Sequence, residues 1–535
     1  MDRAVPEQTM SQSPSSGTIR RIWQRHSALI SLAGAIIILL VNFWAGMDAH
    51  WDYEYPLHVD EYFAMGYTDA MMDEGSLTYH DPYRDGTISK HHEMGFHLLM
   101  GSFREMTGLS WLGFYRIAPA VMLVLISFLV YALGHREGYG WAAALFVILI
   151  PTSIRTLGPA FLVPMVGAML FIPVAILILH RIESIGTTKA LLLLMVLIGV
   201  TVSFHPPTGG IVFALIALYL FALTIEGLID RKYFRSGGVI AAIGVMLVVP
   251  LMIMLRWQYA YFDRIWEKMP NNDSGMTELL GFHSGFIEAF GIIATVLFTA
   301  GSLAFLYVRA YRLRTYVLPA YILLLFAFMY IVYPRYDLGP NILYERGWSY
   351  VGLFMAIMAG FGIARYFRSI SRLNLKIRQH ASPIQAVAVM AGITVLVMAL
   401  TTGFFGNKRD QYAGYYYMVG DQIRSDFVWL GENTTDSHKV ALMEGSLAWT
   451  YPPIAGAGNQ VNGAVASPQA HKWSQEAEAA FNTGEIETEW IEKQGASVLY
   501  SRWPVSQEAR NMSNNDLIQV RPGVYLVPES IDAAH

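Results

Sequence analysis

Long apolar segments dominate the first 405 residues of this 535-residue chain. A helix needs roughly 20 apolar residues to cross about 30 Å of hydrocarbon, and about eleven segments approach this length. Two of them, the third and the fifth, are short and could form a broken pair. The pattern predicts an α-helical polytopic membrane protein with spans near Ser27–Met47, Trp111–Gly134, Trp141–Pro151, Pro159–Leu179, Ala190–Phe204, Gly210–Leu228, Val239–Arg256, Phe286–Val308, Tyr316–Tyr333, Gly347–Ile363 and Ile384–Phe405.

The composition agrees with this class. Hydrophobic residues make up 54% of the chain and charged residues 15%, with no cysteine, whereas a soluble chain is about a quarter charged. Disordered, collagen-like and disulfide-bonded scaffolds are excluded. The chain has no basic stripe, so we expect no nucleic-acid partner.

The distribution of Lys and Arg predicts the orientation in the bilayer. If the N-terminus is cytoplasmic, the inward loops hold about 17 Lys and Arg residues and the outward loops about 9, as the positive-inside rule requires. We therefore predict a multi-pass protein of the cell membrane whose C-terminus lies outside the cytoplasm.

The chain divides into three predicted parts. Residues 1–26 form a cytoplasmic, disordered N-terminus, and residues 27–405 form the transmembrane domain, whose first outward loop covers 48–110. Residues 406–535 alternate short apolar runs with helical patterns, which predicts a small extracytoplasmic α/β domain. Its expected elements are helices at Tyr415–Leu430, Ser474–Phe481 and Ile486–Lys493 and strands at Lys439–Met443, Ser497–Ser501 and Gln519–Val527.

The first outward loop concentrates ionisable residues in a fixed order. An acidic pair, Asp60-Glu61, follows the first span and opens an amphipathic stretch. A Lys90-His91-His92 turn then precedes a second helical stretch. Gly108 and Ser110 lead into Arg116 at the outer start of the second span.

This order resembles the GT-C superfamily of polytopic membrane glycosyltransferases, which use polyprenyl-phosphate sugars. The protein O-mannosyltransferase and lipid A aminoarabinose transferase group is the most similar, and the resemblance covers roughly residues 27–180. Two features depart from the family. The turn has histidines where the family has prolines, and the Trp-Trp-Asp-Tyr-Gly signature of oligosaccharyltransferases is absent.

The resemblance implies a role for each residue. Asp60 matches the family's general base, which accepts the proton of the attacking acceptor, and the transfer would invert the anomeric carbon. Glu61 could tune Asp60 or share a Mg²⁺ or Mn²⁺ ion with it. The leaving lipid phosphate needs positive charge, for which the candidates are Lys90, His91, His92, Arg116, Arg335 and Arg346.

Each assignment has a plainer alternative. An acidic pair in a loop is often only solvated, Arg116 could lie at the interface, and Arg335 or Arg346 could form local ion pairs. Glu93 and His97 are four residues apart and could pair, but the histidines of this loop do not have zincin spacing. His205-Pro206-Pro207 is typical of a turn, and the alternative is that this histidine lines a cavity.

We therefore expect a membrane glycosyltransferase that moves a hexosyl or pentosyl group from a polyprenyl-phosphate donor to an extracytoplasmic glycan, lipid or protein. The lipid bilayer is then a partner as well. The alternatives are a transporter or flippase and a non-catalytic envelope assembly protein. Transporters place charges near the bilayer midplane, whereas here the charges crowd the outward loops.

Overall fold

The computed structural model of the chain is mostly helical. It describes residues 32–83, 88–89, 93–150, 158–159, 161–230, 290, 295–301, 303, 305, 313–329, 341–373, 417–433, 440–442, 447, 449–456, 498–500 and 518–526.

Five helices in this part of the chain are long and apolar enough to cross a membrane. Shorter apolar helices pack beside them: α5 (Gly140–Phe146) with η2 (Val147–Leu149), α6 (Pro164–Met169) with α7 (Phe171–His180), and α15 (Val317–Ala327) after η3 (Leu313–Tyr316). The five long helices are Leu32–His50, which ends in η1 (Asp48–His50), α4 (Trp111–His135), α9 (Thr187–Phe204), α10 (Pro206–Ile229) and the segment Arg346–Ala364 of α17 (Asn341–Leu373).

The described helices correct the sequence prediction in detail. The fifth predicted span is not short, because α9 continues back to Thr187 and reaches 18 residues. The fourth is divided at Leu170 into α6 and α7, and Pro164 begins the first of them. The predicted spans Val239–Arg256 and Ile384–Phe405 lie outside the described residues. The eleven-span count therefore stays a prediction.

Small residues let the spanning helices approach one another. On α17, Gly360 lies against Ala143 of α5, where an added Cβ would come within 2.4 Å of the Ala143 backbone. Gly301 meets Ala359 of α17 in the same way. Small residues at such crossings are typical of membrane helix bundles, since close approach replaces the hydrophobic driving force. As a result, α17 runs through the core, and 89% of the most apolar part of its segment Arg346–Ala364 is buried.

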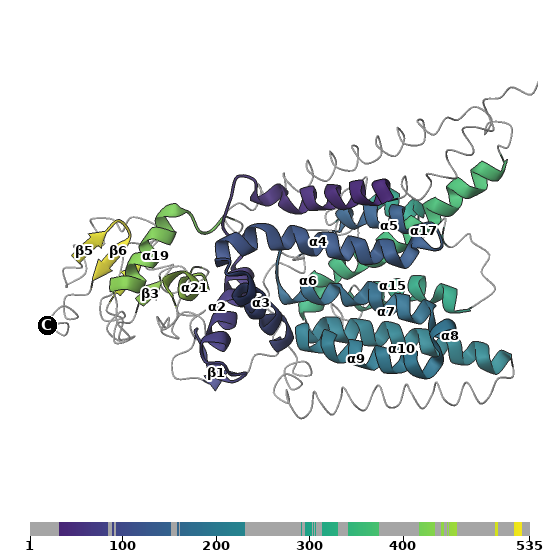
Figure 1. The fold of residues 1–535 in the computed structure, drawn as a ribbon, viewed down its shortest axis with the longest axis horizontal. Helices are drawn as coiled ribbons and strands as arrows, with labels where there is room; N and C mark the ends of the chain where they lie inside the picture. The colour runs from purple at the N-terminus through teal and green to yellow at the C-terminus, as the bar shows by residue number, and fades with distance from the viewer. Residues whose placement is uncertain are drawn as a thin grey trace, which may run out of the picture.

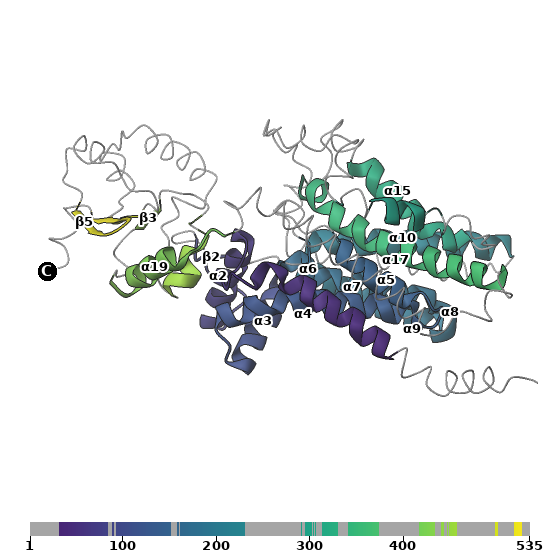
Figure 2. The same ribbon diagram turned by 90° about the horizontal axis from the view of Figure 1, so that it is seen from above.

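Helices α2 (Val59–Asp73) and α3 (Met94–Thr107) from the loop 48–110 lie across one end of the bundle (Figures 1 and 2). Asp69 of α2 forms an ion pair with Arg104 of α3 and accepts a hydrogen bond from Trp111 Nε1 of α4 at 2.7 Å. The short strands β1 (Tyr79–His80) and β2 (Ile88–Ser89) pair antiparallel between the two helices. These contacts fix the loop on the bundle.

The C-terminal part contains α19 (Asp421–Asn433), α21 (Tyr451–Ala455) and a four-stranded sheet in the order β3-β4-β6-β5. β3 (Val440–Leu442) and β4 (Val498–Tyr500) are parallel and match two predicted strands. The predicted strand Gln519–Val527 is instead a hairpin, β5 (Ile518–Arg521) and β6 (Val524–Leu526). The chain turns between them at Gly523, whose φ of 83° favours glycine.

Aromatic residues just before α2 and on α2 itself contact this part of the chain. Tyr53 donates a hydrogen bond to the Val419 carbonyl at 2.8 Å, and Tyr55 donates one to Asp421. The Trp449 ring lies 4.7 Å from the ring of Phe63 on α2. In both views the C-terminal part therefore lies beyond α2, on the side away from the bundle (Figures 1 and 2).

Candidate active site at the loop-covered end of the bundle

Asp60 lies in the first turn of α2, where backbone N–H groups have no helical partner. The N-cap residue of α2, His58, has an extended backbone, and its Nδ1 accepts a hydrogen bond from the Asp60 N–H at 3.1 Å. Burial lowers the pKa of His58, which keeps its ring neutral and able to accept. This cap therefore fixes the first turn of α2 and, with it, the orientation of the Asp60 side chain.

Arg346 meets Asp60 from the far end of the sequence. Its Nη2 donates to Asp60 Oδ2 at 2.8 Å, although the two residues are 286 positions apart. The side chains are 35% exposed for Asp60 and 22% for Arg346, so the pair remains open to a ligand. Two residues that the sequence suggested separately, one as base and one as phosphate ligand, thus lie in direct contact.

Glu61 points the opposite way, into the protein. Its Oε2 accepts hydrogen bonds from the N–H groups of Leu57 at 2.7 Å and His58 at 3.1 Å, and its Oε1 accepts one from Leu162 at 2.7 Å. The residue is fully buried, and burial raises its pKa to about 7. These contacts tie the loop before α2 to the segment before α6.

A second acid pairs with a histidine beside Asp60. Glu93, at the start of α3, places Oε1 at 3.6 Å from Nε2 of His205, the N-cap residue of α10. His205 Nδ1 accepts from the Thr208 N–H at 3.2 Å, so in the neutral ring Nε2 carries the proton and faces Glu93. His97, the partner that sequence spacing suggested for Glu93, instead places Nδ1 at 2.9 Å from Thr68 Oγ1.

Helix α17 connects the two acid pairs. Tyr350 lies one turn after Arg346, and its hydroxyl is 2.5 Å from Thr208 Oγ1, which is itself 2.8 Å from His205 Nδ1. Burial raises the pKa of Glu93 to about 8, the charge of Arg346 lowers it, and the charge of Asp60 raises it further. Glu93 is therefore protonated at neutral pH. Its pKa depends on the charges of both Asp60 and Arg346.

Besides Arg346, the predicted phosphate ligands number five, of which only Arg116 falls in the described part of the chain. Lys90, His91, His92 and Arg335 lie outside the described residues. Arg116 is exposed on α4 and keeps the alternative of an interfacial side chain.

The described carboxylates do not favour the Mg²⁺ or Mn²⁺ site suggested by the acidic pair. Both oxygens of Glu61 already accept backbone N–H groups, so Glu61 does not fit as a metal ligand next to Asp60. In the part of the chain that the structure describes, no group of three or more His, Asp or Glu side chains is arranged to hold a metal ion. We therefore derive no step through a metal.

Sequence reasoning missed the contact between Glu93 and His205. The only available signal was a histidine just before two prolines at the end of an apolar span, a place where an ionisable residue suggests function. Spacing along the sequence could not identify Glu93 as the partner of His205, because the two residues lie at the starts of different helices, α3 and α10.

Comparison with solved structures identifies the fold as that of the GT-C membrane glycosyltransferases. The oligosaccharyltransferase AglB from Archaeoglobus fulgidus, solved with an inhibitory peptide and a dolichol-phosphate, gives a TM-score of 0.59 at 12% identity, covering 89% of this chain and 70% of AglB. The mycobacterial arabinofuranosyltransferase AftD gives 0.51 at 15% identity, covering 93% of this chain and 39% of AftD.

The chain belongs to DUF6541, a family of unknown function, which it matches over residues 110–442. No curated protein matches it. Neither structural neighbour is a protein O-mannosyltransferase or an aminoarabinose transferase, so that choice of subgroup stays a prediction. The apolar helices and the fold together establish a membrane protein.

Proposed function

We propose that this protein transfers a sugar from a polyprenyl-phosphate donor to an acceptor outside the cytoplasm. The observation that carries the proposal is the pairing of Asp60 with Arg346 at the loop-covered end of a GT-C fold. A half-open carboxylate beside a guanidinium offers a proton acceptor and an anion ligand within one site. A lipid-linked sugar phosphate needs both.

The two residues divide the work. Arg346 binds the donor phosphate, because a guanidinium matches phosphate geometry and keeps its charge. Asp60 then loses its internal partner and is free to accept a proton. The acceptor hydroxyl or amide attacks the anomeric carbon as the bond from that carbon to the phosphate oxygen breaks. The acceptor proton passes to Asp60, the lipid phosphate leaves on Arg346, and a single displacement inverts the anomeric centre.

Glu93 and Glu61 support this step in different ways. Protonated Glu93 adds no negative charge beside the departing phosphate and can donate a hydrogen bond to it. Glu61 fixes the backbone around the start of α2 and does not reach the donor. We assign Glu61 as a positioning residue for Asp60.

The positions of the ionisable residues favour an enzyme over a transporter or flippase. The pairs of Asp60 with Arg346 and of Glu93 with His205 lie where the spans end, near the N-termini of α10 and α17. A transporter site is expected near the bilayer midplane, between broken helices. A non-catalytic assembly protein would show no turnover of any donor. An activity assay therefore distinguishes it from an enzyme.

The class of reaction is tested with purified protein in lipid and a panel of labelled donors: polyprenyl-monophosphate sugars, polyprenyl-diphosphate sugars and nucleotide sugars. We expect release of the lipid phosphate from a polyprenyl-monophosphate donor only. Movement of a donor between leaflets without cleavage would instead support the flippase. If the protein neither cleaves a donor nor moves one between leaflets, the result would support the assembly role.

A further inference from the structure

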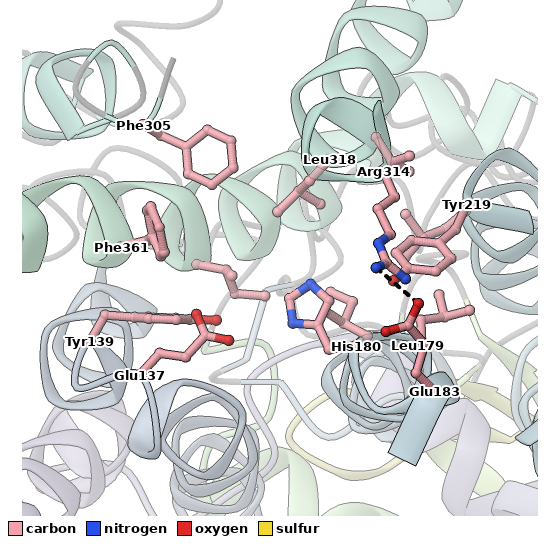
Figure 3. Close-up of a pocket in the computed structure, with 14 residues that line it drawn as sticks. Glu137, Tyr139, Leu179, His180, Glu183, Tyr219, Phe305, Arg314, Leu318 and Phe361 are labelled. Atoms are coloured by element: carbon pink, nitrogen blue, oxygen red, sulfur yellow. Dashed lines mark hydrogen bonds and ion pairs between the residues drawn. The ribbon is translucent and has the colours of Figure 1, made fainter. Parts of the chain in front are cut away.

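A second site lies at the other end of the bundle. A partly open cavity of about 430 Å³ is lined there by residues of α7, α10, η3, α15 and α17 (Figure 3). Ligand pockets of small molecules begin at about 300 Å³. Helix α8 (Ile182–Ile185), which borders the cavity, lies at the end of the molecule away from α2 and α3 (Figure 1).

The cavity has a charged side. Arg314 is only 11% exposed and is paired with Glu183 at 3.1 Å and with Glu226 at 3.5 Å. The backbone N–H of Arg314 also donates to Glu226 Oε1 at 2.9 Å, which fixes the start of η3. Glu183 is 47% exposed, so it lies at the rim while Arg314 lies deeper.

Other polar groups face the cavity from the opposite wall. Glu137 and Tyr139, between α4 and α5, lie across from Arg314, and the ring of His180 lies between the two sides (Figure 3). His180 is exposed into this space although it ends the apolar helix α7. Tyr219 lies beside Arg314, and the rest of the wall is apolar and includes Phe305, Leu318 and Phe361 (Figure 3).

This arrangement selects for a particular chemistry. Three carboxylates, of Glu137, Glu183 and Glu226, accompany one guanidinium, so a purely anionic ligand is disfavoured. A zwitterion matches better: its phosphate can reach Arg314 and His180, while its ammonium faces Glu183 or Glu137. The aromatic and aliphatic wall suits the first carbons of acyl chains at a membrane interface.

We propose that the cavity binds the headgroup of a zwitterionic phospholipid whose amine is a primary ammonium. Three N–H donors distinguish such a headgroup from a quaternary ammonium of the same charge. The site is separate from Asp60, and its occupation does not depend on the proposed transferase reaction.

Native mass spectrometry of the detergent-purified full chain tests the proposal. The protein is incubated with phosphatidylethanolamine, phosphatidylcholine or phosphatidylglycerol of identical acyl chains, or with glycerophosphoethanolamine, which carries the headgroup alone. We expect one phosphatidylethanolamine bound at least about tenfold more tightly than the other two lipids, and weaker binding of the soluble headgroup. Equal retention of phosphatidylethanolamine and phosphatidylcholine, or preference for phosphatidylglycerol, would overturn the proposal.

Matched substitutions assign the binding to this cavity. Glu183→Gln removes one rim charge and keeps the side-chain size, so phosphatidylethanolamine binding should fall about tenfold. Glu105→Gln makes the same change on the exposed face of α3 and should leave binding unchanged. If Glu183→Gln does not fold, Glu137→Gln provides the same test from the opposite wall. Unchanged binding in the folded cavity variant would place the lipid elsewhere.

Discussion

Two neighbouring acidic residues on α2 have separate environments and separate roles. Asp60 is half-exposed and meets Arg346, whereas Glu61 is buried and accepts three backbone N–H groups. Adjacent helical residues leave the axis about 100° apart, so one turn of helix can present one acid to a ligand and the other to the core. The sequence predicted the pair but could not distinguish its members, because that distinction depends on the segment near Leu162.

Substitution of the two acids should therefore destabilise the protein to different extents. Glu61→Gln replaces one carboxylate oxygen with an NH₂ group that faces backbone donors, and we expect a loss of about 2–4 kcal/mol of unfolding free energy. Asp60→Asn disrupts a partly exposed ion pair and should cost under about 1 kcal/mol. Thermal unfolding of the purified variants measures both. Equal destabilisation would refute the assignment of Glu61 to the core.

Glu93 should make stability depend on pH. Its pKa is about 8 in the folded protein against 4.5 for the free side chain, so the unfolded chain loses this proton first as pH rises. Stability is therefore fully present below pH 4.5 and declines until about pH 8. Glu93→Gln, which keeps the neutral form, should flatten this decline by a few kcal/mol. An unchanged pH profile of the unfolding midpoint would contradict the burial argument.

At the scale of elements, α17 organises both ends of the molecule. Its first turns bring Arg346 to Asp60 and Tyr350 to Thr208, and its later turns pack against α5 at Gly360. Hydropathy predicted this span correctly as far as Ile363, since the apolar run is continuous. It could not predict which helices α17 crosses, because small residues occur in several spans.

The crossing of α17 and α5 gives a prediction for packing. Gly360→Ala would place a Cβ about 2.4 Å from the Ala143 backbone, and we expect a loss of about 1–3 kcal/mol. Gly199 of α9 has no atom within 4 Å of an added Cβ, so Gly199→Ala should be neutral or stabilising by about 0.5–1 kcal/mol. Thermal unfolding compares them; equal effects would mean that α17 does not approach α5 this closely.

At the scale of the whole molecule, the sequence predicted the class of protein more readily than the contacts between its side chains. Long apolar runs predicted a membrane protein, because membrane thickness fixes span length. The resemblance to a GT-C fold came from the order of Asp60-Glu61, the Lys90 turn and Arg116 along the chain. The association of Glu93 with His205, and of Asp60 with Arg346, depends on how α2, α3, α10 and α17 meet, which local patterns do not encode. The hairpin at Gly523 was missed for a simpler reason: its strands have three and four residues.

The predicted orientation of the whole molecule can be tested because the chain has no cysteine. Met106 on α3 is 86% exposed, and Arg136 follows the opposite end of α4. We expect Met106→Cys to react with a membrane-impermeant maleimide in intact cells and Arg136→Cys to react only after permeabilisation. The reverse labelling pattern would invert the topology and remove the active site from the extracytoplasmic side.

The central claim is that Asp60 is the base of a lipid-phosphate sugar transferase. Single-turnover release of polyprenyl phosphate, measured for the wild type, Asp60→Asn and the control Asp73→Asn at the exposed end of α2, tests it most directly. We expect at least about a hundredfold loss in Asp60→Asn and nearly wild-type turnover in Asp73→Asn. Wild-type turnover in Asp60→Asn would show that another group accepts the proton.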